Sequence, residues 1–218
     1  MKSISGFGAI RSALANRNYR IFTCGNLVSH LGTWVQRVAV GWLTWRMTES
    51  GAWLGIVAFA DLFPTVVLAP LTGAVADRVN RLSLMRFTQS LHLIQAATLA
   101  ALTHYGLMTI ELLVLLMVVS GSIVSFNQPV RLAIVPSLID RRDLAAAIGI
   151  NSLVFNGARF IGPAIAGYLI VGFGVETAFA FNSVTFLAFV GMLYMLRLPA
   201  PPGAARSPSS VRAIPREI

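Results

Sequence analysis

Charge and cysteine are scarce in this sequence of 218 residues. Only 11% of the residues are charged, whereas an ordinary soluble domain carries about 25%. Hydrophobic residues make up 56%, more than a soluble sphere of this size could bury. These proportions exclude a soluble globular protein, and they exclude disorder because a disordered chain has low hydrophobicity. The composition instead predicts a membrane protein with several spans.

The motifs of common catalytic sites are also missing. The single cysteine, Cys24, rules out an internal disulfide framework. The sequence has no phosphate-binding loop, no cysteine–histidine cluster with metal-ligand spacing and no serine nucleophile elbow. We therefore expect neither an enzyme nor a cofactor or metal site. Energy for any transport would come from an ion gradient, not from nucleotide hydrolysis.

Long apolar segments are present, and there are six of them. A helix that crosses the hydrocarbon core needs about 20 mostly apolar residues. The segments cover residues 21–45, 53–76, 87–105, 110–130, 144–171 and 177–196. They predict an all-α transmembrane domain over residues 21–197. We interpret residues 1–20 as a cytoplasmic arm without a signal-peptide cleavage site, and residues 198–218 as a flexible cytoplasmic linker or tail.

The net charge of +9 is an orientation signal. Of the 17 basic residues, 13 lie in the arm, in the tail and in the second-to-third and fourth-to-fifth connections. The opposite loops hold Arg46 alone, together with three glutamates. Because basic residues favour the cytoplasmic side, both termini are expected in the cytoplasm. No basic patch is interleaved with aromatic residues, so we expect no nucleic-acid partner.

A charged loop with a recognisable spacing follows the second apolar segment. It reads G-x-x-x-D-R-x-x-R, with Gly73, Asp77, Arg78 and Arg81 at the named positions. This loop resembles the signature loop of the major facilitator superfamily, in which a second glycine stands at Asn80 and a further basic residue at Leu82. Asparagine tolerates a left-handed turn better than other non-glycine residues. The resemblance implies a gating role in alternating access, with Gly73 allowing close helix contact. The alternative is a generic positively charged inner loop.

A second motif lies in the fifth segment, where Gly162, Pro163 and Gly167 follow the pattern small-x-x-x-G-P-x-x-small-G. It resembles the fifth-helix motif of proton-coupled efflux members of that superfamily, although Ala158 and Ala166 stand where glycine is commoner. Small residues four apart let helices approach closely in lipid. Ordinary small-residue packing is the alternative reading of this pattern.

More loosely, residues 16–196 resemble the siderophore and macrolide exporter branch. The stretches that carry this likeness are Leu31-Gly32, Leu62-Phe63-Pro64 and the segment from Gln128 to Pro136. The resemblance implies that the six helices are the amino-terminal half of a twelve-helix transporter, built as a 3+3 inverted repeat. It also implies a partner, either the missing carboxy-terminal half or a second copy of this chain.

Ionisable residues inside spans are costly and are therefore functional candidates. Arg37 lies eight residues before Trp45, and Asp61 lies eight residues after Trp53. At about 1.5 Å per residue both would sit roughly 12 Å below the outer boundary, which predicts an Arg37–Asp61 ion pair. Asp61 is also the proton-coupling candidate, because burial favours the neutral carboxyl once the pair opens. A permanently paired structural aspartate is the alternative.

Polar residues recur on one face of several predicted helices and predict a central substrate cavity. They are Asn26, His30, Thr33 and Arg37 in the first, Ser125 and Gln128 in the fourth, and Asn156 and Arg159 in the fifth. Such faces point at protein or at a water-filled cavity, although interhelical hydrogen bonding alone would also account for the neutral ones. With Arg159 near its middle, the cavity would favour anionic or zwitterionic substrates. Arg131 is expected to snorkel to the inner interface and to pair with Asp77, and the sixth helix, the least polar, is expected to face lipid.

Together these observations predict a proton-driven exporter of small, anionic or amphiphilic molecules in a bacterial inner membrane. The alternatives are a six-helix membrane protein that acts alone in an interaction or structural role, and a half-transporter that forms a homodimer.

Overall fold

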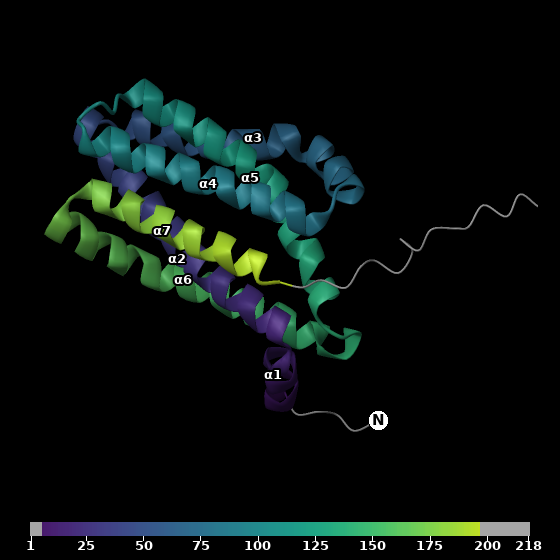
Figure 1. Ribbon diagram of the computed structural model, residues 1–218. Helices are drawn as coiled ribbons and strands as arrows, with labels where there is room; N and C mark the ends of the chain where they lie inside the picture. The colour runs from purple at the N-terminus through teal and green to yellow at the C-terminus, as the bar shows by residue number, and fades with distance from the viewer. Residues whose placement is uncertain (1–5, 197–218) are drawn as a thin grey trace, which may run out of the picture.

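The computed structural model describes residues 6–196, apart from the side chains of residues 6, 7, 9, 74 and 76–78. Within that range it contains helices and no strand. The helices are α1 (Gly6–Ala15), α2 (Arg17–Thr48), α3 (Gly51–Arg78), α4 (Arg81–His104), α5 (Ile110–Leu138), the 3-10 turn η1 (Arg141–Asp143), α6 (Leu144–Phe173) and α7 (Val175–Tyr194). The six long helices lie side by side, with α1 projecting from one end (Figure 1).

Each of the six predicted segments coincides with one long helix. By length and composition, the described helices α3, α5, α6 (with η1) and α7 can cross a membrane. Helices α2 and α4 are equally helical but more polar, and several of their polar side chains are buried against neighbouring helices. Those buried side chains include Asn26 and Gln36 in α2, and Gln89, His92 and Gln95 in α4. Six long helices are therefore present, whereas six membrane crossings stay a prediction.

Helix α7 is packed more closely than its apolar sequence led us to expect. It lies against both α2 and α4, and Figure 1 shows it between them. Phe179, Asn182 and Phe189 are fully buried on these faces, whereas Val184 and Leu187 remain exposed. The expectation that the sixth helix simply faces lipid is therefore corrected, because only one of its sides is exposed.

Helix starts are set by side chains that satisfy the free amide groups of the first turn. Asn16 caps α2 by accepting from the backbone N–H groups of Asn18 and Tyr19 at 3.0 and 3.2 Å. Asn80 caps α4 in the same way and has an extended backbone, with φ −61°. The left-handed turn expected at Asn80 is therefore absent, and its value lies in capping.

The arm of residues 1–20 contains a helix that was not predicted. Helix α1 packs beside α6 and η1, where the Ser12 hydroxyl donates to Asp143 Oδ2 at 2.9 Å. Asp143 is the N-cap residue of α6, but its side chain makes no capping hydrogen bond. Residues 1–5 and the tail 198–218 lie outside the described residues.

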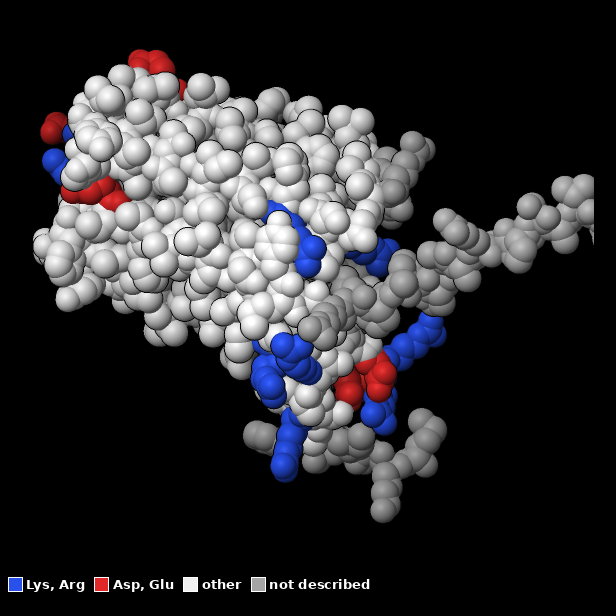
Figure 2. Space-filling view, in the orientation of Figure 1, with Lys and Arg blue, Asp and Glu red and all other residues white. Residues whose placement is uncertain are grey.

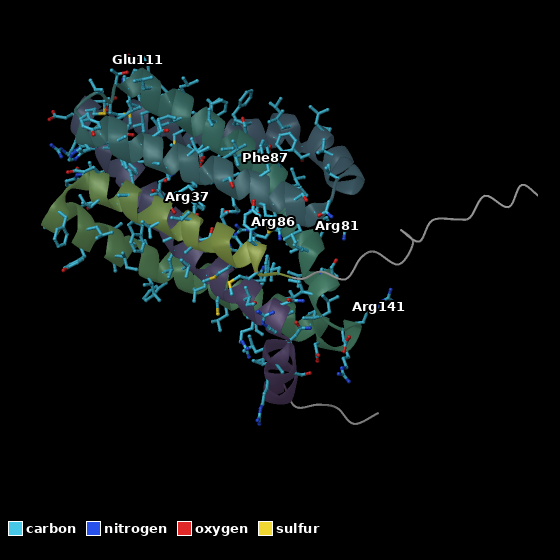
Figure 3. All side chains as sticks on the ribbon, viewed as in Figure 1. Arg37, Arg81, Arg86, Phe87, Glu111 and Arg141 are labelled. Carbon is cyan, nitrogen blue, oxygen red and sulfur yellow. The ribbon has the colours of Figure 1, made fainter. Side chains whose placement is uncertain are left out.

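Charge is separated between the two ends of the bundle. Arginines gather at the end that carries α1 and η1, whereas Glu49, Glu111 and Glu176 lie at the other, which also holds Arg46 (Figure 2). Figure 3 places Arg81, Arg86 and Arg141 toward the first end, Glu111 at the second and Arg37 between them. This separation follows the loop charges counted in the sequence.

Several close helix contacts depend on the absence of a side chain, and two of them lie beside the charged residues. A Cβ atom on Gly121 of α5 would collide with the backbone carbonyl of Asp61 in α3, and one on Gly162 of α6 would collide with Trp34 of α2. These glycines bring α3 and α6 close to the helices that carry the charged residues described next. A Cβ on Gly73 or Gly167 would meet no atom among the described residues, so the close contact expected at Gly73 is not made there.

Candidate functional site

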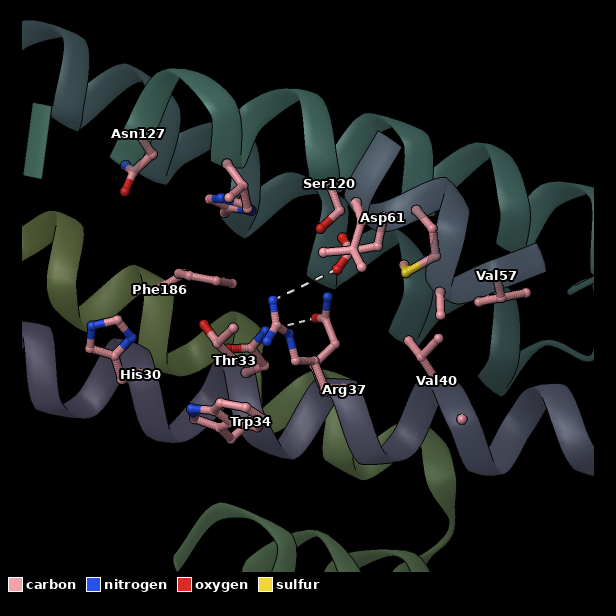
Figure 4. Close-up of a pocket in the computed structure, with 18 of the residues that line it drawn as sticks. His30, Thr33, Trp34, Arg37, Val40, Val57, Asp61, Ser120, Asn127 and Phe186 are labelled. Carbon is pink, nitrogen blue, oxygen red and sulfur yellow. Dashed lines mark hydrogen bonds and ion pairs between the residues drawn. The ribbon is translucent and has the colours of Figure 1, made fainter. Parts of the chain in front are cut away.

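A cavity of about 360 Å³ lies between the long helices, and all six contribute to its wall. This volume suits a small-molecule ligand. Five of the predicted site residues line it, namely His30, Thr33, Arg37, Asp61 and Gln128. In Figure 4, His30 and Asn127 lie toward one end, Arg37 and Asp61 in the middle, and Val40 and Val57 toward the other.

The predicted ion pair between α2 and α3 is present. Arg37 Nη2 lies 3.8 Å from Asp61 Oδ2 (Figure 4), and 45% of the Arg37 side chain and 20% of the Asp61 side chain are exposed. The Arg37 guanidinium also stands 5.0 Å from the centre of the Trp34 ring. The depth count therefore placed the two residues correctly, and the pair is open enough to exchange partners.

A chain of buried amides that the sequence analysis missed runs through the same region. Asn182 Nδ2 donates to Gln36 Oε1 at 2.7 Å, and Gln36 Nε2 donates to Gln95 Oε1 at 3.2 Å. The chain connects α7, α2 and α4, and both Gln36 and Asn182 line the cavity. In the sequence these amides stand in three separate helices. Counting the polar face of one helix at a time does not show that they meet.

Arg131 differs most from expectation. It is 9% exposed and lines the cavity, where its Nη1 lies 2.8 Å from His30 Nε2. The expected snorkelling is wrong because α5 continues to Leu138, seven residues further, so Arg131 lies inside the helix and not at its end. The Asp77 side chain lies outside the described residues, so the predicted Arg131–Asp77 pair stays a prediction.

Four predicted cavity residues do not line the cavity in this structure. Asn26 donates to Asn151 at 3.0 Å, and Ser125 donates to the carbonyl of Ser122 at 2.7 Å. Asn156 donates to the carbonyl of Ser152 at 2.9 Å, and the Arg159 guanidinium lies 5.5 Å from the centre of the Trp34 ring. These contacts are local or interhelical, which was the alternative considered for the neutral residues.

The wall that α6 gives to the cavity is aromatic. Close packing of Gly162 on Trp34 brings α6 against α2, and Phe155 lines the cavity from α6. Phe155 stands edge-on to both His30 and Trp34, with ring centres 5.3 and 6.1 Å apart. An apolar surface therefore adjoins the charged groups.

The signature loop is described only in part, because the side chains of Asp77 and Arg78 are outside the described residues. Arg81 Nη1 donates to the carbonyl of Ala133 at 3.1 Å and so connects the start of α4 to α5. In the fifth-helix motif, Pro163 lies inside α6 and is exposed. Among the described residues, no group of three or more histidine, cysteine or acidic residues is placed to hold a metal ion.

Comparison with known families assigns the chain. The model of the family described as "Transmembrane secretion effector" matches residues 9–215, nearly the whole sequence. The chain belongs to this family of major facilitator transporters. The family is one of membrane transporters and not of enzymes, which agrees with the expectation from the sequence.

The curated relatives are also transporters or exporters. The chain is 28% identical over 180 residues to the staphyloferrin A transporter of Staphylococcus aureus, covering 82% of this chain and 45% of that one. It is 29% identical over 188 residues to the putative bacilysin exporter BacE of Bacillus amyloliquefaciens, covering 84% and 44%. The chain thus spans less than half the length of these relatives. No solved structure matched.

Proposed function

We propose that this chain forms one six-helix unit of a proton-driven exporter of small anionic or amphiphilic molecules. The observation that carries the proposal is the cavity, which all six long helices line and which holds an ion pair amid apolar helices. Charges in such a setting are costly and are therefore functional candidates. Relatives named as a siderophore transporter and an antibiotic exporter support this class of substrate.

Proton coupling is assigned to Asp61. It is the one carboxylate that lies far from any helix end among residues whose side chains the structure describes. Its salt bridge to Arg37 is long enough to open at small cost. When the pair opens, the carboxyl takes up a proton, and when the pair reforms, the proton leaves. Alternating opening and closing would then exchange protons for substrate.

A second six-helix unit is expected to face the cavity. Helices α3 and α6 have large exposed apolar side chains, such as Val66 and Phe160, which suit contact with another helical unit or with lipid. The helix contacts also agree with a 3+3 repeat. Exchanging α2, α3 and α4 with α5, α6 and α7 turns the contact of α3 with α5 into that of α6 with α2, and the contact of α2 with α7 into that of α5 with α4. The partner is a separate second half or another copy of this chain.

The proposed location is a bacterial inner membrane, with both termini in the cytoplasm. The support is the gathering of arginines at the end of the bundle that carries α1 and η1, together with the three glutamates at the other end (Figure 2).

Everted membrane vesicles that contain the chain test this function. An exporter in this orientation should accumulate labelled benzenesulfonate when respiration acidifies the vesicle lumen, and an uncoupler should release the label. Accumulation equal to that of vesicles without the chain would contradict the proposal. In a Cys24→Ser background, disulfide crosslinking of a Val66→Cys variant would identify a second copy as the partner.

A further inference from the structure

The buried end of the cavity contains a cation that has no counterion among the described side chains. Arg131 lies in α5, is 9% exposed and contacts His30. The guanidinium group can only donate hydrogen bonds, so the contacting Nε2 of His30 must be an unprotonated acceptor. His30 is therefore neutral in this contact and does not balance the charge of Arg131. The Phe189 ring, 5.7 Å away, offers only a weak cation–π contact.

No carboxylate among the described side chains serves this end. The charged groups that line the cavity are Arg37, Asp61 and Arg131, and the single carboxylate is engaged by Arg37. The other titratable neighbour, His92, stacks on Phe186 with ring centres 5.1 Å apart. The cavity thus carries one positive charge more than its own groups neutralise. A buried charge of this kind is costly unless a partner arrives.

The geometry of Arg131 leaves one edge of the guanidinium group unused. Nη1 is held by His30, Nε is buried without a partner, and Nη2 makes no hydrogen bond to a described residue. Nε and Nη2 form the edge that binds a carboxylate or similar oxyanion through two parallel hydrogen bonds. Nε is enclosed in this conformation, so a two-point contact requires a small rotation of the guanidinium group.

We infer that Arg131, oriented by His30, is the anion subsite of this cavity and binds the oxyanion head group of a small-molecule substrate. The inference rests on the proposed transport function and narrows its substrate class to molecules with one such group beside an apolar body. Phe155, Phe186 and Trp34 line the same cavity and would contact that body. The structure thereby assigns anion recognition to Arg131, which the sequence had placed at the membrane interface.

Binding to the purified full chain in phosphatidylcholine nanodiscs tests the subsite. The probes are benzenesulfonate, whose charge does not titrate near neutral pH, and benzenesulfonamide, a neutral molecule with the same ring. Quenching of tryptophan fluorescence gives both affinities, with Trp34 in the cavity wall as reporter. We expect the sulfonate to bind at least about tenfold more tightly than the sulfonamide, because charge-assisted hydrogen bonds are the stronger kind. Equal affinities in the wild type would overturn the inference.

Variants locate the effect. Arg131→Gln should make the two affinities equal, Arg131→Lys should keep part of the preference, and Arg46→Gln, at the far end of the bundle, should keep all of it. Without ligand, Arg131→Gln should melt no lower than the wild type, because it removes an uncompensated buried charge. A lower melting temperature with an unchanged sulfonate preference would make Arg131 a structural residue and refute the subsite. We expect Asp77→Asn to leave sulfonate binding unchanged. Stronger binding in that variant would mean that Asp77 neutralises Arg131, and it would contradict the inference.

A lipid head group and a transported substrate can be told apart at this subsite. If an anionic lipid is the occupant, phosphatidylglycerol will raise the melting temperature through Arg131 and the sulfonate will not, which contradicts the inference. Vesicle accumulation without a sulfonate preference would refute the subsite and leave the transport function standing. A sulfonate preference without accumulation would refute the transport function and leave the subsite standing.

Discussion

The two arginines in the cavity wall have opposite surroundings. Arg37 is 45% exposed and lies beside a carboxylate, whereas Arg131 is almost fully buried and lies beside a neutral imidazole. The exposed cation is thus the one with a counterion. A half-exposed pair contributes at most about 1 kcal/mol to stability, so it can break and reform cheaply. A buried cation with no carboxylate beside it among the described residues retains its full capacity for an anion. The difference suggests a division of labour between coupling at Asp61 and binding at Arg131.

The largest expected effect comes from forcing α3 and α5 apart next to the paired carboxylate. Gly121→Val should press on the carbonyl of Asp61 and cost about 3 kcal/mol or more, because the obstacle is backbone and not a flexible side chain. The Arg131–His30 contact joins α5 to α2 and lies ten residues further along α5, so it should persist. Thermal unfolding in detergent measures the loss, with Gly55→Val as control because a Cβ there meets nothing. Equal losses in both variants would rule out the close α3–α5 approach.

The next largest effect is expected from breaking the chain of buried amides, which should affect both ends of the cavity. Asn182→Leu should remove the donor to Gln36 and leave a buried amide oxygen unpaired, which costs about 1–3 kcal/mol. Both sulfonate binding and proton-driven uptake should fall, since the chain of amides holds α2 against α7 and α4. Val184→Leu, on the exposed side of α7, is the matched control for unfolding and for both assays. Unfolding of Asn182→Leu at the wild-type temperature would show that the amide chain carries no stability.

A smaller effect is expected from the ion pair itself. Arg37→Gln and Asp61→Asn, made singly and together, should give a coupling free energy of about 1 kcal/mol or less, since the pair is partly exposed. Chemical denaturation of the four proteins completes the cycle. A coupling of several kcal/mol would mean a rigid structural pair and would undermine its role as a switch. Strictly additive changes in both stability and transport would show that the two residues do not interact.

The smallest effect is expected at the third arginine. Arg159 is exposed and lies over the Trp34 ring, so Arg159→Gln should cost about 0.5 kcal/mol and leave the sulfonate preference intact. Fluorescence titration decides this point. Loss of the preference in Arg159→Gln would move anion recognition from α5 to α6, where the sequence had first placed it.

The helices and the ion pair could be predicted from the sequence because both follow from counting residues. Apolar length gives the helix number, and rise per residue gives the equal depth of Arg37 and Asp61. Arg131 was misplaced because the fourth apolar segment was taken to end at residue 130, next to Pro129, although the helix continues to Leu138. Asn156 and Arg159 were also assigned to the cavity because periodicity shows which residues share a face, but not which neighbour that face meets. The rotation of α6 depends on the contact between Gly162 and Trp34, a tertiary fact.

The most direct test of this division of labour is the uptake of labelled benzenesulfonate by everted vesicles, measured as exchange without a proton gradient and as accumulation with one. Asp61→Asn should keep exchange at the wild-type rate and lose accumulation, because substrate still binds but no proton is coupled. Arg131→Gln should lose both, because the anion no longer binds. Loss of exchange in Asp61→Asn, or exchange at the wild-type rate in Arg131→Gln, would contradict the account.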